Sequence, residues 1–119
     1  LHGQVDSVEP FYDKARVFIV PTRFAAGVPH KAHEAAAHGV PMVVTPLIAA
    51  QLGWDSEVEI ASEGTVFADR CMALHQDAAL WETRRQAAWA AVERDCSPST
   101  FRRTVAEIVA ADRPAVCSD

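Results

Sequence analysis

The sequence has 119 residues, of which half are hydrophobic and 23% are charged, and its formal net charge is −5. A chain of this length forms one domain at most, with a core of moderate size. The negative balance, without a run rich in lysine or arginine, excludes a protein built to bind nucleic acid non-specifically, because such binding depends on many phosphate contacts. The ordinary apolar fraction excludes intrinsic disorder. We therefore expect a folded globular domain.

The cysteines and the apolar runs bear on the cellular compartment. Cys71, Cys96 and Cys117 are odd in number and lack both C-x-x-C spacing and a disulfide framework, which favours a reducing compartment. The residues show no signal-peptide pattern and no apolar run near the length that spans a bilayer. We predict a cytoplasmic protein, and a membrane-associated part elsewhere in a longer protein stays open.

The first half of the chain has the pattern of a β-α-β unit. Residues 8–14 carry apolar side chains at helical spacing, and residues 17–20 form an apolar run that predicts a strand buried on both faces of a parallel sheet. The alanine-rich residues 28–38 predict a helix that Gly39 ends, and residues 40–45 predict a second buried strand. A strand, a helix and a strand within about 30 residues predict a right-handed crossover.

The second half is predicted to be mostly helical. Residues 47–54 indicate only a weak helix or a loop, residues 58–61 an edge strand, and residues 66–75 a helix. Gln76 or Asp77 is expected to cap the next helix, which reaches to about Arg94. Its expected apolar stripe is Trp81, Ala88, Trp89 and Val92, with Arg84, Arg85 and Glu93 largely off it.

The last predicted helix starts at Ser97 as its cap, with Pro98 at its first position. Its expected buried face consists of Phe101, Val105, Ile108 and Val109. Together these elements predict an α/β fold, a Rossmann-like parallel sheet with flanking helices and a helical C-terminal segment. We place one partial domain at residues 1–110 and a frayed tail at residues 111–119.

Residues 21–46 contain the predicted ligand site. In open α/β sheets ligands bind beyond the carboxyl ends of the strands, which is where the loop of residues 22–27 falls. Gly27 permits a sharp turn and a close approach of the backbone to a ligand, and the amides from His30 onward point out of a helix N-terminus, which suits a phosphate. Lys31 and Glu34 are three residues apart and therefore share a face of that helix.

These residues also carry a family resemblance. The run G-V-P-H-K-A-H-E-A-A-A-H-G-V-P-M-V-V-T, preceded by V-F-I-V-P-T-R, resembles the donor-binding signature of the retaining GT-B glycosyltransferases of family 4. Further matches follow in the family's order from the first residues to the last helix, so the resemblance extends over about residues 1–110. It implies that the chain is a partial second domain, the nucleotide-sugar-binding domain, of a longer protein.

The resemblance implies a role for each matching residue. Glu34 corresponds to the second acid of the family's E-x7-E motif and would accept hydrogen bonds from the ribose, while Gly27, with Val28 and His30 beside it, would lie against the phosphates. Lys31 would face the diphosphate and act in catalysis. The chain departs from the motif at Ala26, where the family has the acid that usually holds hydroxyl groups of the donor sugar.

The function implied is transfer of a sugar from a nucleoside diphosphate sugar to an acceptor hydroxyl with retention of configuration, without a metal or another cofactor. The acceptor, a saccharide, a lipid or a small molecule, would be bound by an N-terminal domain outside this chain. We therefore expect the 119 residues alone to be inactive. Arg23, in the loop at the strand end, either reaches the substrate or is an ordinary solvated arginine.

Two other classes of function stay open. Ala26 permits a non-catalytic nucleotide-binding or interaction module. The histidines suggest a metal hydrolase, because His30, Glu34 and His38 are spaced four residues apart along one predicted helix. Against this, His33 and His38 are five residues apart, which turns them about 140° from each other, whereas a zinc-binding H-E-x-x-H helix needs a spacing of four.

Overall fold

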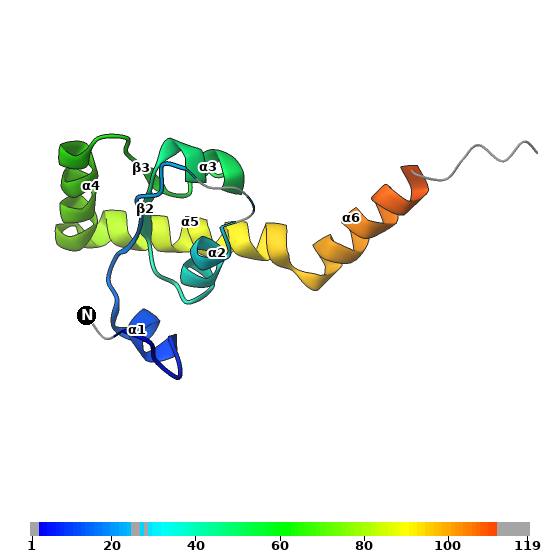
Figure 1. Cartoon of the computed structure of the whole chain (residues 1–119), viewed down its shortest axis with the longest axis horizontal. Coiled ribbons are helices and arrows are strands. Elements are labelled where there is room, and N and C mark those ends of the chain that lie inside the picture. The colour runs from blue at the N-terminus through cyan, green and yellow to red at the C-terminus, as the bar shows by residue number, and fades with distance from the viewer. Residues whose placement is uncertain (1–2, 25–26, 28, 112–119) are drawn as a thin grey trace, which may run out of the picture.

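The structure is a computed structural model that describes residues 3–24, 27 and 29–111. Nine helices and strands are assigned within these residues (Figure 1): α1 Glu9–Lys14, β1 Phe18–Val20, α2 His30–Ala37, β2 Met42–Val44, α3 Pro46–Leu52, β3 Glu59–Ile60, α4 Gly64–Gln76, α5 Ala78–Cys96 and α6 Pro98–Ala111. The predicted α/β class, with a parallel sheet, flanking helices and a helical C-terminal segment, is confirmed. The segment read as a weak helix or a loop contains a helix, α3.

The sheet has three parallel strands in the order β1-β2-β3. Phe18 pairs with Met42 and Val20 with Val44, and Val44 in turn pairs with Ile60. The predicted unit of strand, helix and strand is confirmed, since α2 connects two adjacent parallel strands. Because all three strands run the same way, their carboxyl ends meet at one edge of the sheet.

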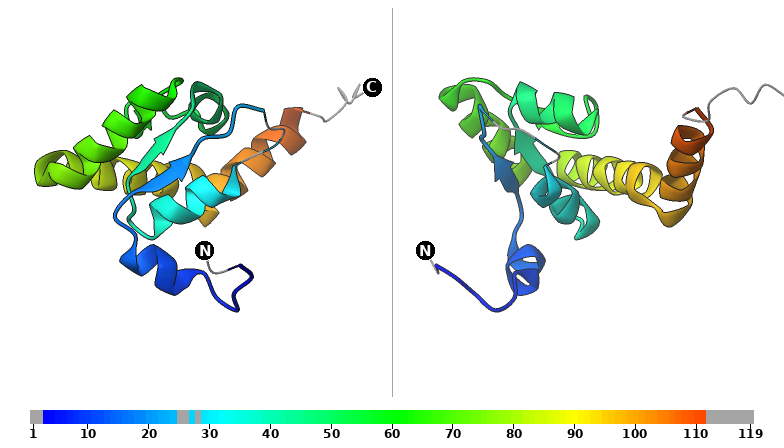
Figure 2. Two further views of the ribbon diagram at one scale, coloured as in Figure 1. Left: turned by 60° about the vertical axis from the view of Figure 1, so that its left-hand side comes forward. Right: turned by 45° about the vertical axis from the view of Figure 1, so that its right-hand side comes forward.

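Helices cover both faces of the sheet (Figure 2). One face carries α2 and α3, and the small side chains Ala32, Ala35 and Ala36 let α2 lie close to the strands and to α5. The main core lies there, around the fully buried Trp54 and Met42. The other face carries α4, whose Leu74 packs in a second, smaller cluster.

The first strand is not buried on both faces as expected. Ile19 is 53% exposed, whereas Phe18 and Val20 are half-buried against the main core. Val43, which pairs with Ile19, is completely buried in the smaller cluster with Leu74 of α4. The reason for the difference is that α4 packs on the two later strands and leaves the same face of β1 uncovered.

Three predicted helix boundaries are confirmed, whereas α2 starts at His30 and α4 at Gly64, two residues from their predicted starts at 28 and 66. Gly39 follows α2 with φ of +74°, and its N–H donates to the carbonyl of Ala36. Asp77 caps α5, where its Oδ1 accepts from the amides of Ala79 at 3.0 Å and Leu80 at 3.1 Å. The Oγ of Ser97 accepts from the amide of Thr100 at 3.2 Å, at the start of α6.

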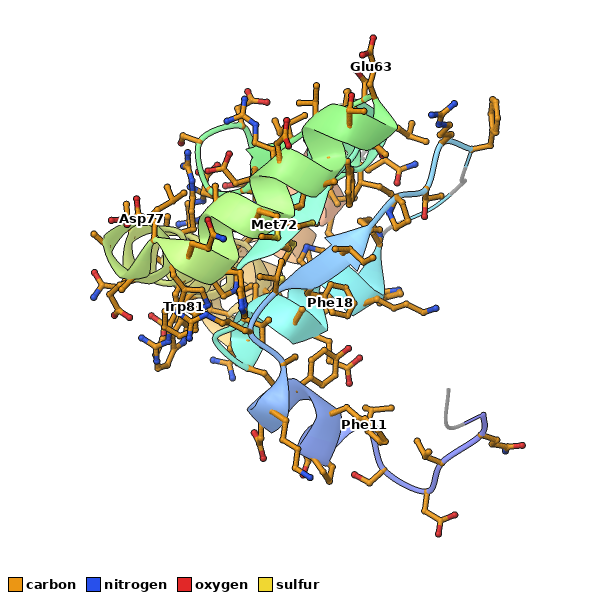
Figure 3. The ribbon with its side chains drawn as sticks, turned by 90° about the vertical axis from the view of Figure 1, so that its left-hand side faces the viewer. Phe11, Phe18, Glu63, Met72, Asp77 and Trp81 are labelled. Atoms are coloured by element: carbon orange, nitrogen blue, oxygen red, sulfur yellow. The ribbon has the colours of Figure 1, made fainter. Side chains whose placement is uncertain are left out.

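Helix α5 also fixes the lead-in to the first strand. The indole Nε1 of Trp81 donates to the carbonyl oxygen of Arg16 over 2.7 Å, at the segment between α1 and β1 (Figure 3). Ala88 and Ala91 of the same helix are buried against the main core, while Trp89 is 42% exposed and lies under the guanidinium of Arg85. The tryptophans are therefore core and rim residues, as expected.

The prediction that the last helix buries its apolar face is wrong. Phe101, Val105, Ile108 and Val109 are all exposed, because α6 extends away from the sheet and its helices (Figure 1). Helical spacing identified the apolar side of α6 correctly, but no described element covers that side. No helix among the described residues is both long and apolar enough to cross a membrane.

Candidate functional site

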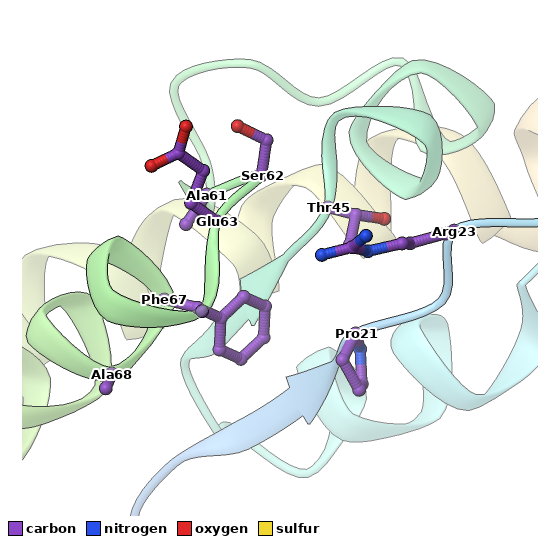
Figure 4. A pocket seen from close by; sticks show the side chains of 9 residues that line it. Pro21, Arg23, Thr45, Ala61, Ser62, Glu63, Phe67 and Ala68 are labelled. Carbon is purple, nitrogen blue, oxygen red and sulfur yellow. The ribbon is translucent and has the colours of Figure 1, made fainter.

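Two adjoining hollows lie at the carboxyl edge of the sheet, with volumes of about 230 Å³ and about 280 Å³. Figure 4 shows the first of them. The hollow of about 230 Å³ is lined by residues that follow all three strands and by the start of α4: Pro21, Arg23, Thr45, Ala61, Ser62, Glu63, Gly64, Phe67 and Ala68. Arg23, Thr45 and Ser62 line both hollows, so they form one continuous site, which we call the edge pocket.

The strand ends give the edge pocket a fixed floor. Thr45, at the end of β2, is buried, and its hydroxyl donates to the carbonyl oxygen of Thr22 over 2.5 Å. This bond joins the loops that follow the first two strands. Phe67 brings an apolar ring from α4, and Arg23 brings a guanidinium from the opposite side (Figure 4). The pocket thus combines a mostly apolar wall with one cation, Arg23, and one carboxylate, Glu63.

Sequence reasoning placed the ligand at this edge of the sheet and left the role of Arg23 open. The structure places Arg23 on the pocket wall, although the residue is exposed. Sequence reasoning missed Ser62, Glu63 and Phe67. The third predicted strand ends at position 61, and in a parallel sheet the residues after each strand share the ligand-binding edge, so a signal for them was present.

The site residues predicted on α2 lie outside the lining of the edge pocket. His30 and Lys31 are exposed in the first turn of the helix, which has no acidic residue, and Pro29 is its N-terminal boundary. Gly27 has φ of +94°, and a Cβ added there would meet no heavy atom within 4 Å. A side chain at Gly27 would therefore meet open space but an unfavourable backbone conformation. Val28 and Ala26 lie outside the described residues.

Glu34 is exposed but has a partner. The phenol of Tyr12 on α1 donates to Oε2 of Glu34 over 3.4 Å. Lys31, three residues earlier on the same helix, is also exposed. A carboxylate and an ammonium group thus stand on one accessible surface of α2, as the spacing predicted.

The histidines of α2 point to different neighbours. The ring of His38 stacks on Tyr12 with centroids 4.7 Å apart, and the ring of His33 meets Trp54 edge-on at 5.5 Å. Burial lowers the pKa of His33, and the nearby His30 lowers it further. Across residues 3–24, 27 and 29–111, no group of three or more His, Cys, Asp or Glu side chains is placed to hold a metal ion.

The two described cysteines have the environment of unreactive thiols. Burial raises the pKa of Cys71 and of Cys96, and the charge of Asp95 raises that of Cys96 further. Asp95 is itself engaged, because its Oδ2 accepts from the indole Nε1 of Trp54 at 2.8 Å. A hydrogen bond from Arg94 holds the pKa of Asp95 below its usual range. The hydrogen bond between Asp95 and Trp54 holds the end of α5 against the core. Neither residue lines the edge pocket.

Comparison with known protein families gives one match, to the glycosyl transferases of group 1, over residues 1–77. No curated protein and no solved structure matches significantly. The matched range contains the three strands, α2 and every residue that lines the edge pocket. Since this range covers more than half of the chain, it assigns a role in glycosyl transfer in general terms, and the chain belongs to the group 1 glycosyl transferase family.

Proposed function

We propose that this chain is the donor-binding part of a retaining glycosyltransferase of the GT-B type. It would bind a nucleoside diphosphate sugar, and the sugar would pass to an acceptor hydroxyl group with retention of configuration. The observation that carries the proposal is the edge pocket, which lies at the carboxyl ends of three parallel strands and has Arg23 on its wall. Helix α2, with Lys31 in its first turn and Glu34 in its second, starts after the same loop.

Arg23 and the start of α2 supply positive charge for a diphosphate, against the single carboxylate of Glu63 on the pocket wall. Helix α2 directs its first free amides outward, and a helix N-terminus carries roughly half a positive charge. Lys31 stands in that first turn, where a cation is slightly unfavourable unless an anion is bound. Arg23 adds a guanidinium, which can bind two phosphate oxygens at once.

Each residue would have a distinct role. The ammonium group of Lys31 and the amides of His30 and Lys31 would stabilise the diphosphate as it departs with growing negative charge, which is electrostatic catalysis. Glu34 would accept hydrogen bonds from the ribose, and the backbone at Gly27 and Val28 would lie against the phosphates and the sugar. None of these steps calls on a metal ion.

The rest of the reaction would depend on a longer protein. We assign residues 1–110 to a partial nucleotide-sugar-binding domain and the acceptor site to an N-terminal domain outside this chain. The isolated 119 residues would then transfer no sugar. A cytoplasmic location, with or without membrane association of the longer protein, fits this assignment.

A second candidate is a nucleotide-binding module without catalytic activity. Ala26 favours it, because the E-x7-E pattern is incomplete and a group expected to hold the sugar hydroxyls is missing. Such a module would bind the nucleoside diphosphate as tightly as the complete donor and would turn nothing over.

Calorimetry and steady-state kinetics on the full-length protein test the proposal. Glu34→Ala should weaken binding of UDP, GDP or ADP by about 1.5–3 kcal/mol, the usual worth of hydrogen bonds to a charged group. Lys31→Ala should lower the transfer rate more than ground-state binding, since its partner charge develops during the reaction. Glu93→Ala and Lys14→Ala, which change exposed residues of other helices, are the matched controls. Normal binding and turnover by both site variants would show that the site is elsewhere.

A further inference from the structure

Tyr12 is the only tyrosine of the sequence, and it joins α1 to α2, the helix that carries the proposed ribose-binding Glu34. Its ring is buried, with 9% of the residue exposed, although it belongs to the short, mostly exposed helix α1. From there its hydroxyl reaches Oε2 of Glu34 on α2, 3.4 Å away. A buried side chain thus ends on the carboxylate of an exposed residue.

Neighbouring rings hold Tyr12 in place. The imidazole of His38 stacks on the phenol ring with an interplanar angle of 5°, and Phe18 of β1 packs on it at a centroid distance of 5.7 Å. His38 follows Glu34 by four residues, so both lie on the side of α2 that faces Tyr12. The ring is therefore fixed by one strand and one helix, and its hydroxyl has a defined direction.

The chemistry of the pair leaves room for a ligand. Burial, and then the charge of Glu34, raises the pKa of Tyr12, so the phenol keeps its proton at neutral pH and remains a donor. A carboxylate has two oxygens and about four acceptor positions. With Oε2 held by Tyr12, Oε1 stays available to accept hydrogen bonds from hydroxyl groups.

We propose that Tyr12 is a positioning residue of the nucleotide site, which orients the Glu34 carboxylate before the ribose arrives. The inference rests on the proposed function, in which Glu34 accepts from the ribose. A glutamate on a helix surface samples several rotamers and loses that freedom on binding. A carboxylate already held by a fixed phenol loses less, so binding is tighter without any new contact to the ligand.

The test removes one oxygen atom. Tyr12→Phe keeps the ring, its stacking and its burial, so the thermal unfolding temperature should change little. Binding of UDP, GDP or ADP to the full-length protein, whichever the wild type binds, should weaken about 2- to 5-fold, the lower part of the range for one hydrogen bond, because the O···O distance of 3.4 Å is long. Thr83→Val on α5 removes another hydroxyl whose only described bond is to the backbone of its own helix, and it should leave binding unchanged.

A double-mutant cycle separates the two proposals. Tyr12→Phe should have no further effect on nucleotide binding when Glu34 is already Ala, because it acts through that carboxylate. If Glu34→Ala weakens binding and Tyr12→Phe does not, the positioning role is wrong and the proposed function stands. If Glu34→Ala leaves binding unchanged, both fail. An equal loss from Tyr12→Phe with and without Glu34 would also overturn the positioning role.

A spectroscopic measurement tests the contact without a ligand. Since the chain has a single tyrosine, tyrosinate absorbance in an alkaline titration reports on Tyr12 alone. Glu34→Ala should lower the pKa of Tyr12, because both the charge of Glu34 and its hydrogen bond raise it. An unchanged titration would show that the two side chains do not meet in solution, and this would overturn the inference.

Discussion

Arg84 on α5 donates from Nε to Oε1 of Glu59 on β3, over 2.8 Å. The Glu59 carboxylate is almost fully buried, with 5% of the residue exposed, and its other oxygen lies 3.3 Å from Nη1 of Arg70 on α4. Arg84 also donates through Nη1 to the carbonyl of Ser56. Two helices are thus bound to the edge strand through one buried negative charge.

Arg84→Met should therefore destabilise the fold strongly. It leaves the buried carboxylate with one partner, and we expect a loss of about 2–4 kcal/mol in the free energy of unfolding, measured by urea denaturation. Arg102→Met on the exposed helix α6 is the control and should cost less than about 0.5 kcal/mol. Adding Glu59→Leu to Arg84→Met should recover part of the loss, because no unpaired charge then remains buried. Equal stabilities of Arg84→Met and Arg102→Met would contradict this account.

Gly39 should tolerate no β-branched residue. Its φ of +74° is unfavourable for side chains with a Cβ, and a Cβ there would lie 3.1 Å from Nε of Arg85. Since the Arg85 side chain can move, backbone strain should dominate, and Gly39→Val should lower the free energy of unfolding by about 1–2 kcal/mol or more. Gly39→Asn should cost less, because asparagine accepts the left-handed conformation better. Gly64→Ala, where φ is ordinary and nothing is near, is the control.

Stability should fall on mild acidification because of His33. Burial holds the pKa of this imidazole below its ordinary value of 6.5, so the unfolded chain binds the proton more readily than the folded one. The free energy of unfolding should therefore decrease as the pH falls through the ordinary value and below. His33→Gln should flatten this slope between about pH 7 and pH 5. Identical slopes for His33→Gln and the wild type would contradict the prediction.

Arg23 should contribute to recognition of the diphosphate. If the edge pocket holds the phosphates, Arg23→Ala should weaken binding of a nucleoside diphosphate roughly tenfold, since a charge-assisted hydrogen bond is worth about 1.5–3 kcal/mol and solvent reduces it at an exposed residue. Binding of the uncharged nucleoside should change little. Arg102→Ala on α6 is the control. An equal loss for the nucleoside and the diphosphate would place Arg23 away from the phosphates.

Local signals in the sequence predicted the local structure well. The end of α2 at Gly39, the cap at Asp77 and the start of α6 at Ser97 and Pro98 follow from the backbone preferences and hydrogen-bonding groups of those residues. These features depend on a few neighbouring residues. They can be read without knowing which elements pack together.

Features that depend on distant partners were predicted poorly. The apolar side chains of Ile19 and of α6 could be buried, but their apolar character does not show whether another element covers them. Arg84 was expected to lie largely off the apolar stripe, and only the fold shows that a buried carboxylate on β3 faces it. The strand at residues 58–61 was predicted, but its parallel pairing with β2 was not, so Ser62 and Phe67 were not placed at the edge pocket.

Local unfolding of helix α6 should need much less free energy than unfolding of the sheet. Its apolar side chains are exposed and it extends away from the sheet, and a helix of 14 residues without much packing is only marginally stable in water. Its backbone hydrogen bonds should open without disturbing the buried strand β2. In deuterated water, the amide hydrogens of α6 should therefore exchange much faster than those of Val43 and Val44, which should exchange only through global unfolding.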